Sequence, residues 1–275
     1  MKKILFTLFV CLNLISNAQR RVKVMSYNIR YENAGDGINQ WKNRKDSLIF
    51  LINKYDPDVI GMQEVLNHQL MDLKAGLPGY EGFGVGRDDG KEQGEYAAVF
   101  FKKNIFERTD GNYFWLSETP EIAGSKSWDA AITRMVSWCK LKHQKTGKII
   151  YIFNTHFDHV GKVARRNSAL LIKEKIKSIA GNELFILTGD LNTEPNEEPY
   201  QILDNPANKP LFIDVAQNNT DGTFCGFNVS NTSCKRIDYI FCSKKMKAKS
   251  YSVVHDNNGV FYPSDHMPVI AEIAF

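Results

Sequence analysis

The stretch MVSWCKLKHQKTGKIIYIFNTH, residues 135–156, decides the class of fold. It contains two strand-like runs, 135–143 and 148–156, separated only by a short turn around Thr146 and Gly147. Strands joined by so short a turn run antiparallel, because a parallel pair needs a crossover of about a dozen residues or more. A purely parallel wound sheet is therefore not expected, and mixed sheets are.

Similar apolar runs recur along the chain and predict six further strands, at 21–29, 58–65, 96–103, 184–192, 236–243 and 268–275. Helical patterns lie between them. Residues 41–55 place Leu48, Ile49, Leu51 and Ile52 on one face, and residues 162–180 do the same with Ala169, Leu170, Ile172 and Ile176. The strands are too many for one small sheet. We therefore expect two packed sheets with helices outside, a layered α/β sandwich.

The first residues, MKKILFTLFVCLNLISNAQ, have the order of a secretory signal peptide, residues 1–18, with cleavage after Ala18. Their apolar run is far shorter than the roughly 20 residues that span a bilayer. Val10 stands where a small residue would precede a lipid-anchored Cys11, so we do not expect lipoprotein anchoring. No later segment predicts a membrane span. Residues 19–275 are expected to be one exported domain, secreted or periplasmic.

The charge of the chain is mildly basic. The formal net charge is +4, and it falls to +2 when Lys2 and Lys3 leave with the signal peptide. A nucleic-acid-binding protein usually shows a concentrated basic face. This balance does not favour nucleic acid as the partner.

Four cysteines remain in the predicted mature chain. Cys139 and Cys242 lie in apolar runs and are expected to be buried thiols. Cys225 and Cys234 bracket the polar loop CGFNVSNTSC, and export favours a disulfide between them. Their spacing fits neither a CxxC pair nor a zinc ribbon, so they are not predicted to bind metal.

Polar side chains stand where the apolar strands stop: Asn28, Glu64, Asn154, His156, Asp190, Asn192, Asp265 and His266. Each has an ordinary interpretation when taken alone, and an isolated Asp after Gly more often caps a turn or helix. Asp238 is different, because a carboxylate inside an apolar strand costs several kcal/mol unless it is paired. Side chains gathered at several strand ends are what a catalytic cleft needs.

Six motifs follow one another in a known order: SYNIR (26–30), QE (63–64), NTHFDH (154–159), GDLN (189–192), RIDYIF (236–241) and SDHMPV (264–269). From about Val22 to Phe275 the chain resembles the endonuclease/exonuclease/phosphatase superfamily, which includes DNase I-like nucleases, inositol-polyphosphate phosphatases and bacterial sphingomyelinases. A lone GDxN would be weak evidence, but six motifs in order are strong. The resemblance implies a four-layered α/β sandwich of two mixed, mainly antiparallel sheets, and a metal-dependent phosphoester hydrolase.

The resemblance also implies roles for the motif residues. Glu64 would be the principal ligand of Mg²⁺, or of Mn²⁺, with Asn28 beside it and Asp265 near or on the metal. Asp190, helped by Asn192, would orient and deprotonate the attacking water. A phosphodiester suits such a site, because its anionic oxygens call for a hard cation with oxygen ligands and an aligned base.

Two histidines would face the scissile phosphate. The resemblance implies that Asp238 holds His266 and that Glu95, in GEYAAVFF, pairs with His156. A carboxylate behind each ring would fix its tautomer and favour the imidazolium. NTHFDH is then no metal cluster, because on a strand His156 and Asp158 share one face while His159 points to the other. Asp158 and His159 are expected to begin the loop before helix 162–180.

Arg30 departs from the pattern, since many relatives have an acidic residue at this position. The sequence therefore leaves open whether the site takes one metal or two. Arg30 could meet substrate phosphate, or pair with Glu32 or another surface acid.

Substrate selection should lie in loops around the cleft. In the aromatic segment 113–134, Trp115 and Trp128 could stack on a base or sugar, or could plug an edge of the fold. Arg134 and Arg165 could bind phosphate bidentately.

Three functions remain open. The first is an exported Mg²⁺-dependent phosphodiesterase or phosphatase acting on a small-molecule, glycan-derived or lipid-derived phosphoester. The second is a secreted nuclease or 3′-5′ exonuclease acting on DNA or RNA, which family precedent favours and the mild charge does not. The third is a non-catalytic phosphoester-binding protein, the least favoured, because only the acid replaced by Arg30 is lost. The sequence indicates no oligomeric state.

Overall fold

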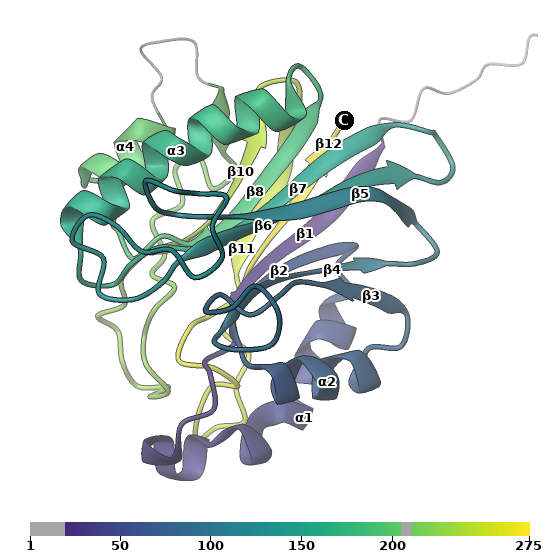
Figure 1. The fold of residues 1–275 in the computed structure, drawn as a ribbon. Helices are drawn as coiled ribbons and strands as arrows, with labels where there is room; N and C mark the ends of the chain where they lie inside the picture. The colour runs from purple at the N-terminus through teal and green to yellow at the C-terminus, as the bar shows by residue number, and fades with distance from the viewer. Residues whose placement is uncertain (1–19, 205–210) are drawn as a thin grey trace, which may run out of the picture.

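The computed structural model describes residues 20–204 and 211–275, so the predicted signal peptide, Cys11 included, lies outside the described residues. Within them, two six-stranded sheets pack face to face, and helices cover the outer side of each (Figure 1). The predicted sandwich of two mixed, mainly antiparallel sheets is confirmed. None of the helices in these two ranges is both long and apolar enough to cross a membrane.

The first sheet has the strand order β11-β12-β1-β2-β4-β3. Its strands are β1 (Arg21–Asn28), β2 (Val59–Val65), β3 (Tyr80–Phe83), β4 (Tyr96–Lys102), β11 (Lys247–Val253) and β12 (Val269–Ala274). A short 3₁₀ helix, η1 (Ala34–Asn39), and α1 (Trp41–Tyr55) connect β1 to β2, and this crossover makes the two strands parallel. The other neighbours are antiparallel. The helix α2 (Asn67–Gly76) lies beside α1 on the outer face (Figure 1).

The second sheet has the order β5-β6-β7-β8-β10-β9. Its strands are β5 (Phe106–Trp115), β6 (Met135–His143), β7 (Ile149–His156), β8 (Leu184–Asp190), β9 (Phe212–Asp214) and β10 (Asp238–Ser243). The predicted hairpin is β6–β7, which is antiparallel. Only β7 and β8 are parallel here, joined by α3 (Lys162–Ala180). This helix and α4 (Glu198–Leu203) cover the outer face, at the upper left of Figure 1.

Each sheet is buried on both faces, which explains why most predicted strands are continuously apolar. One cluster of buried side chains fills the space between the sheets, and two others lie under α1 with α2 and under α3 with α4. The helix faces differ slightly from prediction: Leu170 is 43% exposed, and Ile49 is only partly buried. Cys139 and Cys242 are buried free thiols as predicted, and Cys225 is joined to Cys234.

The predicted strands occur within two residues of their expected ends, whereas β3, β5, β9 and β11 were not predicted. The edge strand β5 shows the reason. Its middle residues are mostly exposed and polar, so it carries no apolar signal. The aromatic segment 113–134 accordingly begins inside this strand rather than in a loop.

Asn154 was expected beside the cleft and is instead fully buried between the two sheets. Its amide nitrogen donates to the carbonyl oxygens of Met62, at 2.8 Å, and Ala98, at 2.9 Å. Its amide oxygen accepts from Gln63 Nε2, at 2.7 Å, and Thr188 Oγ1, at 3.0 Å. All polar atoms of this side chain are satisfied, so it joins β2 and β4 to the opposite sheet.

Gly61 on β2 allows this close approach. A Cβ atom at this position would lie 1.9 Å from Thr188 Oγ1 and 2.6 Å from Asn154 Oδ1. Any larger residue would clash with Thr188 and Asn154 and push the two sheets apart at this point.

Candidate active site

His156, Asp190 and Asp238 lie side by side at one edge of the second sheet. The β7–β8 ladder pairs His156 with Asp190, and the β8–β10 ladder pairs Asp190 with Asp238. Because β10 is antiparallel to β8, it begins at the edge where β8 ends. All three side chains are buried. The predicted convergence of polar strand ends is therefore found.

Asp190 occupies the centre of this group. Its Oδ1 accepts the backbone N–H of Asn192 at 2.9 Å, and its Oδ2 accepts Asn28 Nδ2 at 3.0 Å. The same Oδ2 lies 3.3 Å from Nε2 of His156 and 3.7 Å from Nε2 of His266. Two amide donors thus orient the carboxylate between two imidazole rings.

The charge states of Asp190 and His266 are set by their surroundings. Burial, and next the Asp238 carboxylate, raise the pKa of Asp190 to about 7. Burial disfavours the His266 imidazolium, but the carboxylates of Asp238 and Asp190 outweigh it and raise the pKa of His266 to about 10. His266 Nδ1 lies 2.8 Å from Asp238 Oδ2, which also accepts Thr223 Oγ1 at 2.6 Å. The predicted Asp238–His266 pair is present in the structure.

His156 differs from the prediction in its charge. Burial, and next the cations Arg134 and Arg87, lower its pKa well below the ordinary value. Asn192 Nδ2 donates to the carbonyl oxygen of Phe157 at 2.9 Å and lies 3.0 Å from His156 Nε2, which must therefore accept. A neutral ring protonated on Nδ1 fits the contact with Asn192, in place of the expected imidazolium, and leaves Nδ1 without a hydrogen-bond partner among the described residues.

Glu95 does not offset the effects of burial and of the two arginines on His156. Its carboxylate receives both terminal nitrogens of Arg87, at 2.7 and 2.8 Å, while His156 Nδ1 lies 3.9 Å away. The Arg87 guanidinium forms a bidentate ion pair with the Glu95 carboxylate, whose charge was expected to favour the His156 imidazolium. Glu95 therefore balances Arg87 first and His156 only weakly. No sequence motif pointed to Arg87, which follows Gly86 at the start of a turn.

Glu64 is turned toward the cleft by a bulge in β2. The register between β2 and β4 shifts between Met62 and Val65, and Glu64 has a positive φ of 62°. Its carboxylate accepts Asn28 Nδ2 at 3.0 Å and the backbone N–H of Tyr31 at 3.1 Å. The strained backbone is held by these contacts.

Asn28 bridges carboxylates in this structure. Its Oδ1 accepts the backbone N–H of Arg30 at 3.0 Å, so its amide nitrogen faces Glu64 and Asp190. The amide oxygen, the atom that a cation would need, points to the backbone instead.

Asp265 and Arg30 line the same cavity as Glu64. Burial raises the pKa of the Asp265 carboxyl, and its Oδ2 lies 3.9 Å from Arg30 Nε. Arg30 binds Asp36 through two bonds of 3.0 and 2.9 Å, so its principal partner is a carboxylate of the chain. Arg30 is thus paired with an acid other than Glu32, namely Asp36, whose side chain is only 11% exposed.

Among residues 20–204 and 211–275, two groups of potential metal ligands have donor atoms within 4.8 Å of one another. One consists of Glu64, His156 and Asp190, and the other of Asp190, Asp238 and His266. Asp265 belongs to neither group, although it faces the same cavity. Carboxylate oxygens are the donors that Mg²⁺ or Mn²⁺ prefers, and Glu64, Asp190 and Asp265 supply them here.

The cavity has a volume of about 560 Å³, and both acidic and basic side chains line it. Arg134 lines it and is only 4% exposed. Its Nη2 lies 3.3 Å from His159 Nδ1, while Nε and Nη1 have no partner among the described residues. Burial, and next the charge of Arg87, lower the pKa of Arg134 to about 10. A buried cation with free donors indicates a place for an anion.

The other predicted substrate residues lie away from the cavity. Trp115 is buried and donates its indole N–H to the carbonyl oxygen of Arg87 at 2.6 Å, which favours the structural interpretation. Trp128 is partly buried and is not among the lining residues. Arg165 is buried and donates to the carbonyl oxygen of Asp158 at 3.0 Å. Sequence reasoning missed Phe224, whose ring centroid lies 4.8 Å from that of His266.

Asp158 and His159 lie in the loop before α3 as predicted, but their expected faces were wrong, because β7 ends at His156 and His159 rather than Asp158 lines the cavity with it. Asp158 is buried and accepts four backbone N–H groups, from Ala131, Ile132, Val160 and Gly161. It therefore holds the loop before α3, while His159 lines the cavity.

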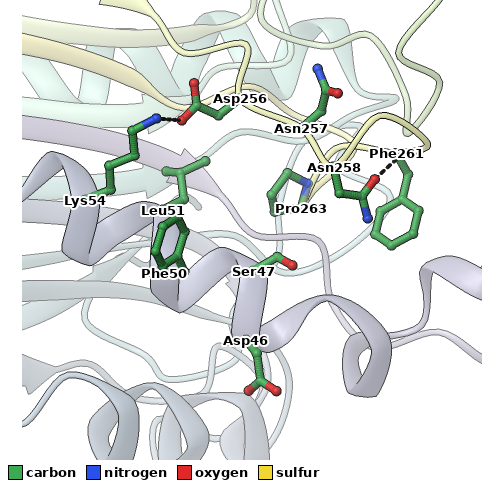
Figure 2. A pocket seen from close by; sticks show the side chains of 10 residues that line it. All are labelled: Asp46, Ser47, Phe50, Leu51, Lys54, Asp256, Asn257, Asn258, Phe261 and Pro263. Carbon is green, nitrogen blue, oxygen red and sulfur yellow. Dashed lines mark hydrogen bonds and ion pairs between the residues drawn. The ribbon is translucent and has the colours of Figure 1, made fainter.

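A larger cavity, of about 750 Å³, lies between α1 and residues 256–263 (Figure 2). Phe50, Leu51, Phe261 and Pro263 form its apolar part, and Lys54 is paired with Asp256 at 2.6 Å. Neither group of potential metal ligands lies in it. Size alone would select this cavity, but the buried acids and histidines place the chemistry in the smaller one.

Comparison with known proteins agrees with this geometry. The model of the Endonuclease/Exonuclease/phosphatase family matches residues 25–266. An endonuclease/exonuclease/phosphatase from Bacteroides vulgatus is 40% identical with a TM-score of 0.88, over 94% of this chain and 100% of that chain. A mannosyl-6-phosphatase of Bacteroides thetaiotaomicron is 37% identical with a TM-score of 0.87, over 92% of this chain and 100% of that chain. An uncharacterized protein of Acanthamoeba polyphaga mimivirus is 26% identical over 229 residues, 80% of each chain.

A two-sheet sandwich with acids and histidines gathered at its strand ends defines a phosphoester hydrolase of the DNase I-like class. The chain belongs to the Endonuclease/Exonuclease/phosphatase family. The predicted family and the predicted class of enzyme are both confirmed.

Proposed function

We propose that the protein is an exported, Mg²⁺-dependent hydrolase that cleaves a P–O bond of a small phosphoester by in-line attack of water. The observation that carries the proposal is Asp190. This buried carboxylate has a pKa of about 7, is oriented by Asn28 and Asn192, and faces two histidines in the cavity. A base of this pKa suits proton transfer near neutral pH.

Glu64 and Asp265 are the residues that would hold the metal, with Asp190 next to them. Their hard oxygen donors fit Mg²⁺, and Mn²⁺ would take the same ligands. Asn28 would set the separation of Glu64 and Asp190 through its two amide bonds. When bound, the cation would neutralise charge on the phosphoryl oxygens.

The side chains of the cavity supply the remaining steps. Asp190 accepts a proton from the water as its oxygen attacks phosphorus, and the bond from phosphorus to the leaving oxygen breaks, with its electron pair going to that oxygen. The leaving oxygen takes a proton from solvent and departs as the alcohol. The His266 imidazolium, held by Asp238, donates to a phosphoryl oxygen on which negative charge grows. Arg134 offers its free donors to the same phosphoryl group or to the substrate beside it. Neutral His156 keeps Asn192 in place.

The substrate is best sought among small phosphoesters. The cavity, of about 560 Å³, falls in the range that holds one small molecule. The relative from Bacteroides thetaiotaomicron is a mannosyl-6-phosphatase, which makes sugar phosphate monoesters the first class to test. The net charge of +4 offers little support for a nuclease. Export rests on the signal-peptide pattern of residues 1–18.

The test is release of phosphate or alcohol from a panel of substrates, with Mg²⁺ and with EDTA. The panel contains mannose 6-phosphate, p-nitrophenyl phosphate, bis(p-nitrophenyl) phosphate, single-stranded and duplex DNA, and RNA. We expect turnover of a small phosphoester that EDTA abolishes and Asp190→Ala removes. No turnover of any substrate, or full rate in Asp190→Ala, would reject the proposal. Binding of a phosphoester without turnover would favour the non-catalytic alternative.

A further inference from the structure

Arg44 on α1 is a fully buried arginine with an unusual set of partners. Its guanidinium donates to four backbone carbonyl oxygens: Asn39 at 2.8 Å, Ile29, Arg30 at 2.6 Å and Pro263 at 3.1 Å. No carboxylate among the described residues forms an ion pair with it. A buried arginine usually has a carboxylate partner. Here the carbonyl groups must stabilise the positive charge instead.

Two aromatic rings complete the surroundings of the guanidinium. Its carbon lies 5.1 Å from the ring centre of Trp41 and 5.7 Å from that of Phe227, within the range of cation–π attraction. Trp41 comes from α1, whereas Phe227 comes from the loop closed by Cys225 and Cys234. The site for this cation is thus assembled from segments that are distant in sequence.

The carbonyl groups belong to the segments that carry the proposed metal site. Ile29 and Arg30 directly follow Asn28, and the next residue, Tyr31, donates its backbone N–H to Glu64 at 3.1 Å. Pro263 stands two residues before Asp265. Arg44 therefore touches both segments at once.

A second contact joins the same segments. Ser264 Oγ donates to the carbonyl oxygen of Asn28 at 2.7 Å. At its other end, α1 holds the loop before Pro263 through the Lys54–Asp256 ion pair at the cavity in Figure 2. The segment 256–263 is thus fixed to α1 by two residues, Arg44 and Lys54. Of these two, only Arg44 also binds the residues that follow β1.

We propose that Arg44 is a positioning residue of the metal site. It sets the distance between two segments, the Asn28–Tyr31 segment and the segment that carries Asp265. The Glu64 carboxylate is bound to the first of them. A guanidinium is suited to this task because its fork of donors has a fixed geometry. A lysine has a single ammonium group, so it could donate to fewer of these carbonyl groups. The inference rests on the proposed metal-dependent function.

The test measures the binding of Mn²⁺ to the purified protein. The concentration of free Mn²⁺ is monitored by electron paramagnetic resonance. We compare wild type, Arg44→Met, Arg44→Lys and the control Leu48→Ala. Leu48 is a fully buried residue of the same helix and belongs to the apolar cluster under the first sheet, so its truncation weakens the packing of α1 while the Arg44 guanidinium is retained. Thermal unfolding identifies a temperature at which every variant compared is folded.

We expect the Kd for Mn²⁺ to rise about 10- to 100-fold in Arg44→Met, the range measured for residues that orient metal ligands. Arg44→Lys should show a smaller rise and Leu48→Ala none. At saturating Mn²⁺, kcat of the Arg44 variants should return toward that of wild type.

Three results would overturn the inference. An unchanged Kd in folded Arg44→Met is one, and an equal rise in Leu48→Ala is another. If Arg44→Met does not fold, an unchanged Kd in Arg44→Lys decides against it. Failure of the wild type to bind Mn²⁺ would instead reject the proposed function, and the role of Arg44 with it.

Discussion

Asp190 and Asp238 are direct partners across the β8–β10 ladder, and the imidazole of His266 contacts both carboxylates. The distances are 2.8 Å from Nδ1 to Asp238 and 3.7 Å from Nε2 to Asp190. Two neighbouring buried acids cannot both ionise freely, so one of them keeps a raised pKa while the histidine stays charged. This arrangement separates a base, Asp190, from a charged donor, His266.

Replacing the base should remove activity without unfolding the protein. We expect Asp190→Asn to lower kcat about 10³-fold, as loss of a general base does. Asp110→Asn on the exposed part of β5 should keep the wild-type rate. The check is steady-state kinetics with circular dichroism of each variant. A rate within tenfold of wild type for Asp190→Asn would exclude it as the base.

The two active-site histidines should carry different charges at pH 8. His266 should be an imidazolium, because its pKa is raised to about 10, and His156 should be neutral, because burial lowers its pKa. Nitrogen chemical shifts of ¹⁵N-labelled histidines measure both states in metal-free protein. In Asp238→Asn, His266 should lose its proton at a lower pH. Equal charge states in the wild type would contradict the structure.

The stability that His266 contributes should depend on pH. Its folded pKa, about 10, lies above the unfolded value of 6.5, so its contribution is complete below pH 6.5 and is lost as the pH rises toward 10. Urea unfolding in EDTA should show the largest destabilisation by His266→Gln at pH 6, and a smaller one at pH 9. A pH-independent difference would mean that the charge of His266 adds no stability.

Glu95 should be coupled to Arg87 and hardly to His156. A double-mutant cycle of Glu95→Gln with Arg87→Gln should give a coupling free energy of about 1.5–3 kcal/mol, the range for hydrogen bonds to charged groups. The cycle of Glu95→Gln with His156→Gln should give much less, because its 3.9 Å contact exceeds hydrogen-bond length. Chemical unfolding supplies the free energies. A larger coupling free energy for Glu95 with His156 than for Glu95 with Arg87 would support the predicted Glu95–His156 pair.

Gly61→Ala should destabilise the sandwich. The new Cβ would meet Thr188 Oγ1 at 1.9 Å, and overpacking of this kind costs about 1–3 kcal/mol or more. Gly79→Ala is the matched control, since its Cβ would have no neighbour within 4 Å. A lower urea midpoint for Gly61→Ala alone is the expected result. Equal midpoints would show that the sheets separate without cost.

Much of the site could be predicted because its residues follow strong local signals. Asp190, His156 and Asp238 end or begin apolar strands, and strand periodicity is a property of neighbouring residues. Their convergence then follows from the pairing of β7, β8 and β10. The edge strand β5 escaped prediction, because an exposed strand needs no apolar pattern.

The sequence by itself determined the two-sheet sandwich, the order of its motifs and the acids and histidines at the strand ends. Tertiary structure alone decided which partners these groups meet. Arg87 takes the carboxylate of Glu95, a bulge turns Glu64 inward, and Arg44 joins two distant segments. The physical reason is that ion pairs and hydrogen bonds depend on distances in space between residues far apart in the chain. Strands and helices depend instead on the pattern of residues that are neighbours in the sequence.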